Sequence, residues 1–127
     1  MTRDEVMAMT DEELWFEALM LARPELGIWR SLGIGHSEDG RAYIGPVGKP
    51  VEWQEDCDYP NDIVSAWELV EKMRGDDKSV WVDVFANANG WEVEIDDDCT
   101  SSIEGDTAAR AITRAFILEM ADKEATD

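Results

Sequence analysis

Basic residues are scarce in this chain: 11 Lys and Arg stand against 30 Asp and Glu, which gives a formal net charge of −19. No Lys or Arg occurs between Lys49 and Lys72, or between Lys78 and Arg110. A field of this sign repels the phosphates of nucleic acids and the head groups of anionic membranes. Direct nucleic-acid binding through a basic patch is therefore excluded, and cationic partners are favoured.

Histidine and cysteine are almost absent. His36 is the only histidine, so neither a zinc site built on paired histidines nor a Cys–His nucleophile is supported, and we expect this residue in a surface turn. Cys57 and Cys99 lack the two-residue spacing of metal or redox pairs. Neighbouring carboxylates disfavour their thiolate forms, because a thiolate would add another negative charge. We expect two unreactive, reduced thiols.

Long apolar runs are also missing. No segment reaches the roughly 20 apolar residues that a membrane-spanning helix needs. Residues 1–9 have neither the basic start nor the apolar centre of an export signal. We therefore expect the protein in the cytoplasm of a host cell, bacterial or infected, where thiols stay reduced.

What is present is the composition of a folded domain. The chain has 127 residues, of which 44% are hydrophobic, and it contains six Trp. This length suits one core and is short for two. We predict a single domain over residues 1–127, with fraying at residues 1–9 and 121–127.

The clearest pattern runs from residue 59 to residue 95. Five apolar residues at three- and four-residue spacing predict one buried face of a helix over residues 61–74: Ile63, Ala66, Trp67, Val70 and Met73. Asn61 or Asp62 is suited to cap this helix, and Gly75 to end it. Alternating residues then predict a hairpin over residues 80–95, closed by Asn89-Gly90, with Glu92 and Glu94 on the face opposite Val93.

The flanking segments complete an α+β fold. Thr10 and Glu13 form a capping-box pattern for a helix that ends before Pro24. Residues 27–53 show short, weak strands rich in glycine and proline. A last helix over about residues 107–123 should turn Ala108, Ala111, Ile112, Ala115 and Phe116 inward. We predict an antiparallel sheet of about four to five strands layered with three helices.

The aromatic residues divide into two groups. Six recur at core-compatible positions, and most of these are expected to be buried: Trp15, Trp67, Trp81, Phe85, Trp91 and Phe116. Trp29 and Trp53 lie in the weaker strands. We interpret these two as candidates for an exposed interface, where tryptophan often contributes much of the binding energy.

The segments "YPNDIVSAWELVEKM", "VWVDV", "WEVEI" and "AARAITRAFILEM" together resemble the phage ABA-sandwich domain, a family of uncharacterised bacteriophage and prophage proteins. The similarity is strongest over residues 59–120, and Trp67 is its most recognisable position. The resemblance implies a helix–sheet–helix sandwich and a phage origin. It implies no catalytic residue and no activity.

No pattern of residues predicts catalysis. Asp96, Asp97 and Asp98 are candidate metal ligands, but a calcium loop starting at Asp96 requires Gly at its sixth position and Glu at its twelfth. Ser101 and Thr107 occupy those places, so a solvated acidic loop is favoured. "GPVGKP" is too short for a phosphate-binding loop and lacks its Ser or Thr. We expect no enzyme activity, no metal and no cofactor.

The candidate partner-binding residues lie in two acidic segments and the two weaker-strand tryptophans: Glu55, Asp56, Asp58, Asp96, Asp97, Asp98, Trp29 and Trp53. Each acidic segment follows a predicted strand, contains one cysteine and precedes a helix. If the two strands run in the same direction in one sheet, both segments share one rim, and Cys57 lies near Cys99. If the strands are antiparallel, the segments lie at opposite ends.

Three functions remain open. The first is a phage accessory protein that binds a basic host or phage protein through its acidic surface, with homo-oligomerisation left open. The second is a DNA mimic, which inhibits a nucleic-acid-binding defence protein and needs regular rows of exposed carboxylates. The third is a domain that sequesters a small ligand, which the shortage of basic residues disfavours for phosphorylated ligands.

Overall fold

The structure is a computed structural model that describes residues 2–75, 80–95 and 98–126. Its α-helices are α1 (Arg3–Met7), α2 (Asp11–Ala22), α3 (Ile63–Arg74) and α4 (Ala108–Thr126), and its 3-10 helices are η1 (Pro24–Leu32) and η2 (Gln54–Asp56). Its strands are β1 (Gly35–His36), β2 (Ala42–Ile44), β3 (Glu52–Trp53), β4 (Val82–Asn87), β5 (Gly90–Ile95) and β6 (Asp98–Gly105). The predicted α+β class is confirmed.

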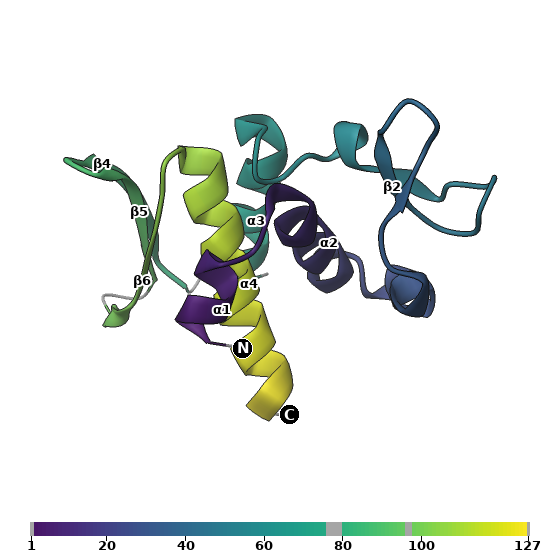
Figure 1. The fold of residues 1–127 in the computed structure, drawn as a ribbon. Helices are drawn as coiled ribbons and strands as arrows, with labels where there is room; N and C mark the ends of the chain where they lie inside the picture. The colour runs from purple at the N-terminus through teal and green to yellow at the C-terminus, as the bar shows by residue number, and fades with distance from the viewer. Residues whose placement is uncertain (1, 76–79, 96–97, 127) are drawn as a thin grey trace.

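The strands form two sheets, whereas a single sheet of four to five strands was predicted. Both sheets are antiparallel and three-stranded, with the orders β1-β2-β3 and β4-β5-β6. Figure 1 shows α2 and α4 between them. The prediction of one sheet was wrong because the helices separate the two sets of strands. The number of helices also differs from the predicted three, because residues 3–7 form the short helix α1 and two 3-10 helices are present.

The sheet β4-β5-β6 has helices on only one of its faces in Figure 1. Its inner face packs mainly against α4. The predicted layering of helices on a sheet is therefore present, with the described helices on the inner face of this sheet. The outer face carries alternating carboxylates, and a second helix layer would have to remove them from water at considerable cost.

Local signals in the sequence account for the helix ends. Thr10 and Glu13 form the predicted capping box of α2, each side chain accepting from the other residue's backbone N–H. The Asp62 side chain accepts from the Val64 N–H at the start of α3. Gly75 ends α3 with φ of 79°. Within residues 1–9, α1 has a capping box of its own and buries Val6 in the core.

The predicted hairpin is present, with β4 paired to β5 from Val82↔Ile95 to Asn87↔Gly90. Its two turn residues are Ala88 and Asn89, so the turn begins one residue earlier than predicted. Gly90 starts β5 with φ of 130°, and a Cβ atom there would lie 2.6 Å from the Gly105 carbonyl oxygen of β6. The close approach of the two strands therefore requires glycine at this position.

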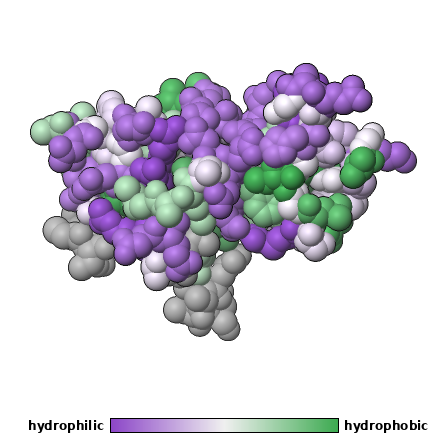
Figure 2. All heavy atoms as spheres, in the orientation of Figure 1, coloured by the Kyte–Doolittle hydropathy of each residue, from purple (hydrophilic) through white to green (hydrophobic). Residues whose placement is uncertain are grey.

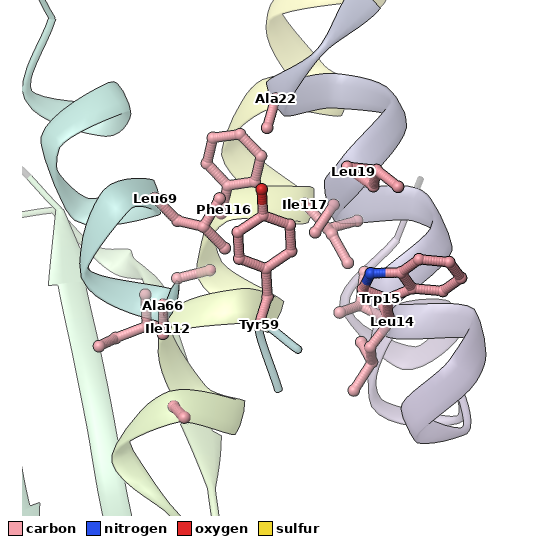
Figure 3. Packing of buried hydrophobic residues seen from close by; sticks show 14 of the residues in the cluster. Leu14, Trp15, Leu19, Ala22, Tyr59, Ala66, Leu69, Ile112, Phe116 and Ile117 are labelled. Atoms are coloured by element: carbon pink, nitrogen blue, oxygen red, sulfur yellow. The ribbon is translucent and has the colours of Figure 1, made fainter. Parts of the chain in front are cut away.

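The core is built around α4, which contacts α1, α2, α3 and all three strands of the β4-β5-β6 sheet. Figure 3 shows Phe116 and Ile117 of α4 facing side chains of α2 and α3. Trp15 and Phe116 are fully buried, as predicted. Val93 and Ile95 of β5 are buried on the face opposite Glu92 and Glu94, so the predicted orientation of this strand is confirmed.

Several aromatic residues predicted in the core are exposed instead. The exposed fractions are 50% for Trp67, 64% for Trp81, 36% for Phe85 and 37% for Trp91. On α3 the buried residues are Ala66, Leu69, Val70 and Met73. The helix is thus rotated so that Leu69 takes the inward place predicted for Trp67. Ile63, which was also expected inside, is 47% exposed.

Candidate protein interface

The outer face of the sheet β4-β5-β6 carries directly opposed carboxylates. Asp83 of β4 pairs with Glu94 of β5, and Glu92 of β5 pairs with Glu104 of β6. Opposed side chains on a sheet have Cβ atoms about 5 Å apart, and like charges in that position are destabilising. The strands contain no Lys or Arg. We call these four residues the acidic sheet face.

Few described contacts relieve this charge. The guanidinium of Arg3 lies 3.8 Å from a Glu104 carboxylate oxygen. The Asn87 amide donates to Glu92 Oε2 at 3.2 Å. Asp83 and Glu104 are exposed, and Glu92 and Glu94 are half-buried. The fold therefore holds four like charges in a regular array that is open to solvent.

A groove of about 330 Å³ adjoins this face between α3 and β4. We call it the α3–β4 groove, and its lining residues are Trp67, Val70, Arg74, Val80, Trp81, Val82 and Asp83. The Val80 N–H donates to the Arg74 carbonyl at 3.3 Å, which ties the chain before β4 to the end of α3. Asp83 belongs to both the groove and the acidic sheet face, so the two are continuous.

Exposed apolar side chains extend the groove in both directions. Beyond Trp67, a shallow depression of about 350 Å³ is lined by Ile63, Val64 and Trp67 itself. On the other side, Phe85 follows Asp83 along the outer face of β4, since alternate residues of a strand share one face. Tryptophans flanked by charged residues are typical of protein interfaces.

On the side of the molecule drawn in Figure 2, hydrophobic residues form small patches. Figure 2 shows one side of the molecule on which hydrophilic residues predominate between such patches. Single exposed apolar residues are ordinary on a protein surface, whereas a continuous apolar groove is more informative. The α3–β4 groove is therefore the stronger candidate for an interface.

The first predicted acidic segment lies far from this groove, beside the sheet β1-β2-β3 (Figure 1). Glu55 accepts from the Arg41 guanidinium at 2.6 Å. Asp58 accepts from the side chains of Gln54 and Asn61. Asp56 is exposed at the end of η2. Glu55 and Asp58 thus hold intramolecular contacts, which reduces their availability to a partner.

The two tryptophans predicted at an interface are both half-buried. Trp53 packs against Tyr43, with ring centroids 5.3 Å apart, and under the Arg41 guanidinium at 4.4 Å. Trp29 lies on η1. The structure places both on the side of the helices away from the acidic sheet face (Figure 1).

The second predicted acidic segment is largely part of a strand rather than a loop. Asp98 begins β6, which continues to Gly105, while Asp96 and Asp97 lie outside the described residues. Among the described residues no group of three or more His, Cys, Asp or Glu is placed to hold a metal ion. The shared rim required two strands in one sheet, and it was wrong because β3 and β5 lie in different sheets.

Cys57 and Tyr59 are titratable residues buried in the core. Cys57 is a free thiol, 5% exposed, whose sulfur accepts from the Trp15 indole at 3.4 Å. Burial raises the pKa of Cys57 to about 11, so the neutral thiol predominates near neutral pH. Burial likewise raises the pKa of Tyr59, which lies among core side chains in Figure 3, to about 12. His36 is exposed, as predicted, but it lies in strand β1 rather than in a turn, and its Nε2 is 2.8 Å from a Glu12 carboxylate oxygen.

Comparison with known families agrees with the resemblance seen in the sequence. The family model of the phage ABA sandwich domain matches residues 34–117, which is more than half of the chain. The protein belongs to this phage family. No match is found among curated proteins or among solved structures. In the part of the chain that the structure describes, no helix has the length and apolar character to cross a membrane.

The matched region contains α3 and the whole sheet β4-β5-β6, and so it includes the candidate interface. The pattern of the sequence predicts Trp67 and Trp81 in the core and does not single out Asp83 or Glu104 as site residues. The outward direction of Glu92 and Glu94 could be predicted from alternation. The cross-strand partners of Glu92 and Glu94, which are Glu104 and Asp83, could be identified only from the register of β4 and β6 against β5.

Proposed function

We propose that this phage domain is a non-enzymatic binding module for a basic segment of a host or phage protein in the host-cell cytoplasm. The acidic sheet face and the α3–β4 groove form its contact surface. The observation that carries the proposal is the register, which sets like charges opposite one another in two cross-strand pairs, Asp83 with Glu94 and Glu92 with Glu104. Repulsion in these pairs is relieved when Lys or Arg side chains of a partner lie between the carboxylates.

The neighbouring tryptophans supply the apolar part of such an interface. Trp67 and Trp81 are 50% and 64% exposed, and both line the α3–β4 groove beside Asp83. Burying a large aromatic side chain contributes free energy of binding, while the carboxylates orient the partner and speed its association. The combination suits a protein segment that carries both basic and apolar residues.

The experiment compares two variants that lose the same number of negative charges. The first carries Asp83→Asn, Glu92→Gln and Glu94→Gln. The control carries Glu25→Gln, Glu38→Gln and Asp56→Asn, all at exposed positions outside the acidic sheet face. Partners captured from infected-cell lysate at low salt are quantified by mass spectrometry.

A partner captured by the wild type and the control, and lost by the first variant and at high salt, is the expected result. Equal capture by the two variants would contradict the proposed surface.

DNA mimicry is the second candidate, and the regular array of carboxylates favours it. Glu92 and Glu94 are two residues apart on β5, which places them about 7 Å apart along the strand. Asp83 and Glu104 stand opposite them on the neighbouring strands. In this case the captured partner binds duplex DNA, and added duplex displaces it from the domain. A partner that stays bound at saturating duplex would rule mimicry out.

A further inference from the structure

We propose that the free edge of β4 receives an extended basic segment of the partner as an added strand. The inference rests on the proposed function and specifies how the same surface binds. In the sheet order β4-β5-β6, β5 is the only strand neighbour of β4 within the described residues. An unpaired strand edge presents a row of backbone donors and acceptors that another chain can use.

The register defines which groups face that edge. The hairpin closes at Asn87↔Gly90 through two turn residues, so this pair exchanges backbone hydrogen bonds. Because bonded pairs alternate along an antiparallel ladder, Asp83, Phe85 and Asn87 bond to β5. The N–H and C=O groups of Val82, Val84 and Ala86 therefore point away from β5, toward the free edge.

β4 lacks three of the common protections of an edge strand, although it carries one charged residue, Asp83. Its six residues contain neither Lys nor Pro, and its pairing with β5 is continuous from Val82 to Asn87. Such an edge is a template for strand pairing. The described hydrogen bonds include no side-chain donor to the backbone of Val82, Val84 or Ala86.

The opposite edge of the same sheet differs. The Arg3 guanidinium donates to the Ser102 carbonyl of β6 at 2.7 Å, and Arg114 donates to the Glu104 carbonyl at 2.9 Å. The pairing of β6 with β5 is also irregular between Val93 and Ile95. Both features oppose the addition of a strand at β6. Among the described residues, side-chain donors thus bind the backbone at the β6 edge, and none does so at the β4 edge.

The surroundings of the open edge define the chemistry of the added strand. Its alternate side chains face the outer side, where Asp83 and Glu94 lie, and the α3 side, where Trp67 and Val70 line the groove. Basic side chains of the added strand fit the outer side, and its apolar side chains fit the side that faces α3. Arg74, the basic residue of the groove, is paired with Glu71 at 3.1 Å.

Charge decides between this occupant and a second copy of the same chain. Two copies joined edge to edge would bring two acidic sheet faces together, each on a molecule with a net charge of −19. Repulsion between them disfavours that assembly, whereas a Lys- or Arg-rich strand is attracted. The edge is therefore assigned to a basic segment.

The test uses a capped peptide of alternating Lys and Val, eight residues long, as the probe. In a strand, alternate residues direct their N–H groups to opposite edges. Two further peptides are N-methylated, one at every Val and the other at every Lys, and both keep the full charge. Affinity is measured by isothermal titration calorimetry.

We expect one N-methylated peptide, and only one, to lose at least about tenfold in affinity, because several edge hydrogen bonds are removed. Binding driven by charge alone would respond equally to both methylations, and that result would overturn strand addition while leaving the proposed function intact.

A variant of the protein gives the matching test. Ala86→Pro removes an N–H from the open edge at an exposed position, where proline is tolerated in edge strands. Ala86→Ser keeps the N–H and is the control. We expect Ala86→Pro to weaken peptide binding at least about tenfold while Ala86→Ser binds as the wild type does, with thermal unfolding confirming that both are folded.

Three other outcomes would overturn the inference. Peptide binding that is lost in the Asp83→Asn, Glu92→Gln, Glu94→Gln variant but kept in Ala86→Pro would leave the acidic surface as the interface without an added strand. No binding of any of the peptides to the wild type would overturn both the inference and the proposed function. A dimer abolished by Ala86→Pro in sedimentation measurements would assign the edge to a second copy.

Discussion

Trp67 was predicted to lie in the core but is half-exposed in the structure. It lies at helical spacing from Ile63 and Val70, and that spacing predicts a buried position. In the structure it is half-exposed between two apolar depressions. Trp15, by contrast, is fully buried and donates its indole N–H to Cys57. The two tryptophans therefore differ in what they contribute to stability.

At the scale of single residues, we predict that truncating Trp15 lowers the free energy of unfolding much more than truncating Trp67. Trp15→Ala should lower the free energy of unfolding by about 3–5 kcal/mol, because it leaves a cavity in the core. Trp67→Ala should lower it by about 1 kcal/mol or less, because half of the side chain is already in water. Urea denaturation of both variants measures the difference. Equal denaturation midpoints would contradict the observed exposure of Trp67.

At the scale of elements, the sheet β4-β5-β6 combines a stabilising face with a destabilising one. Its inner face buries Val93, Ile95 and Ile103. Its outer face opposes Asp83 to Glu94 and Glu92 to Glu104. Burial of the three apolar side chains outweighs the repulsion, since each buried side chain of this size contributes about 1.5–3 kcal/mol. The sheet can therefore carry an acidic face and stay folded.

Removing one of the opposed charges should stabilise the sheet. We expect Glu92→Gln to raise the free energy of unfolding by up to about 1 kcal/mol, because it relieves repulsion from Glu104. Glu38→Gln, in an exposed loop, should change it by less than about 0.5 kcal/mol. A double-mutant cycle between Glu92 and Glu104 isolates the pair. A coupling energy of zero would show that the opposed carboxylates do not interact.

At the scale of the whole molecule, the helices separate two unlike sheets (Figure 1). The β1-β2-β3 side holds acidic residues in pairs with Arg, such as Glu55 with Arg41 and Glu52 with Arg23. The β4-β5-β6 side has fewer such pairs among the described residues. The negative charge of the protein, −19 in total, is therefore neutralised by nearby Arg residues more on the β1-β2-β3 side than on the β4-β5-β6 side.

The net charge predicts a dependence of stability on salt. We expect the melting temperature to rise between low salt and about 0.2 M sodium chloride, because screening weakens repulsion within the compact state. Scanning calorimetry at several concentrations measures the trend. A flat or falling trend would indicate that the carboxylates are already neutralised, and metal removal with a chelator would then show whether a bound cation is responsible.

Local sequence determined the helix ends and the orientation of β5. The capping box at Thr10, the N-cap at Asp62 and the C-cap at Gly75 each act within one helical turn. They can therefore be predicted from the sequence without knowledge of the tertiary structure. The alternation of Glu92, Val93 and Glu94 depends only on the geometry of a strand. The acidic character of the surface likewise follows from composition.

Only the tertiary structure decided which apolar residues of α3 are buried and where the acidic face lies. Ile63, Trp67 and Leu69 sit on overlapping apolar stripes, and packing against α4 selected the stripe that contains Leu69. The sequence predicts an acidic loop where β6 lies, because these residues show weak strand patterning, and the register that pairs them with β5 appears only in the structure. Helical periodicity defines a set of faces, but the neighbour that buries one of them comes from elsewhere in the chain.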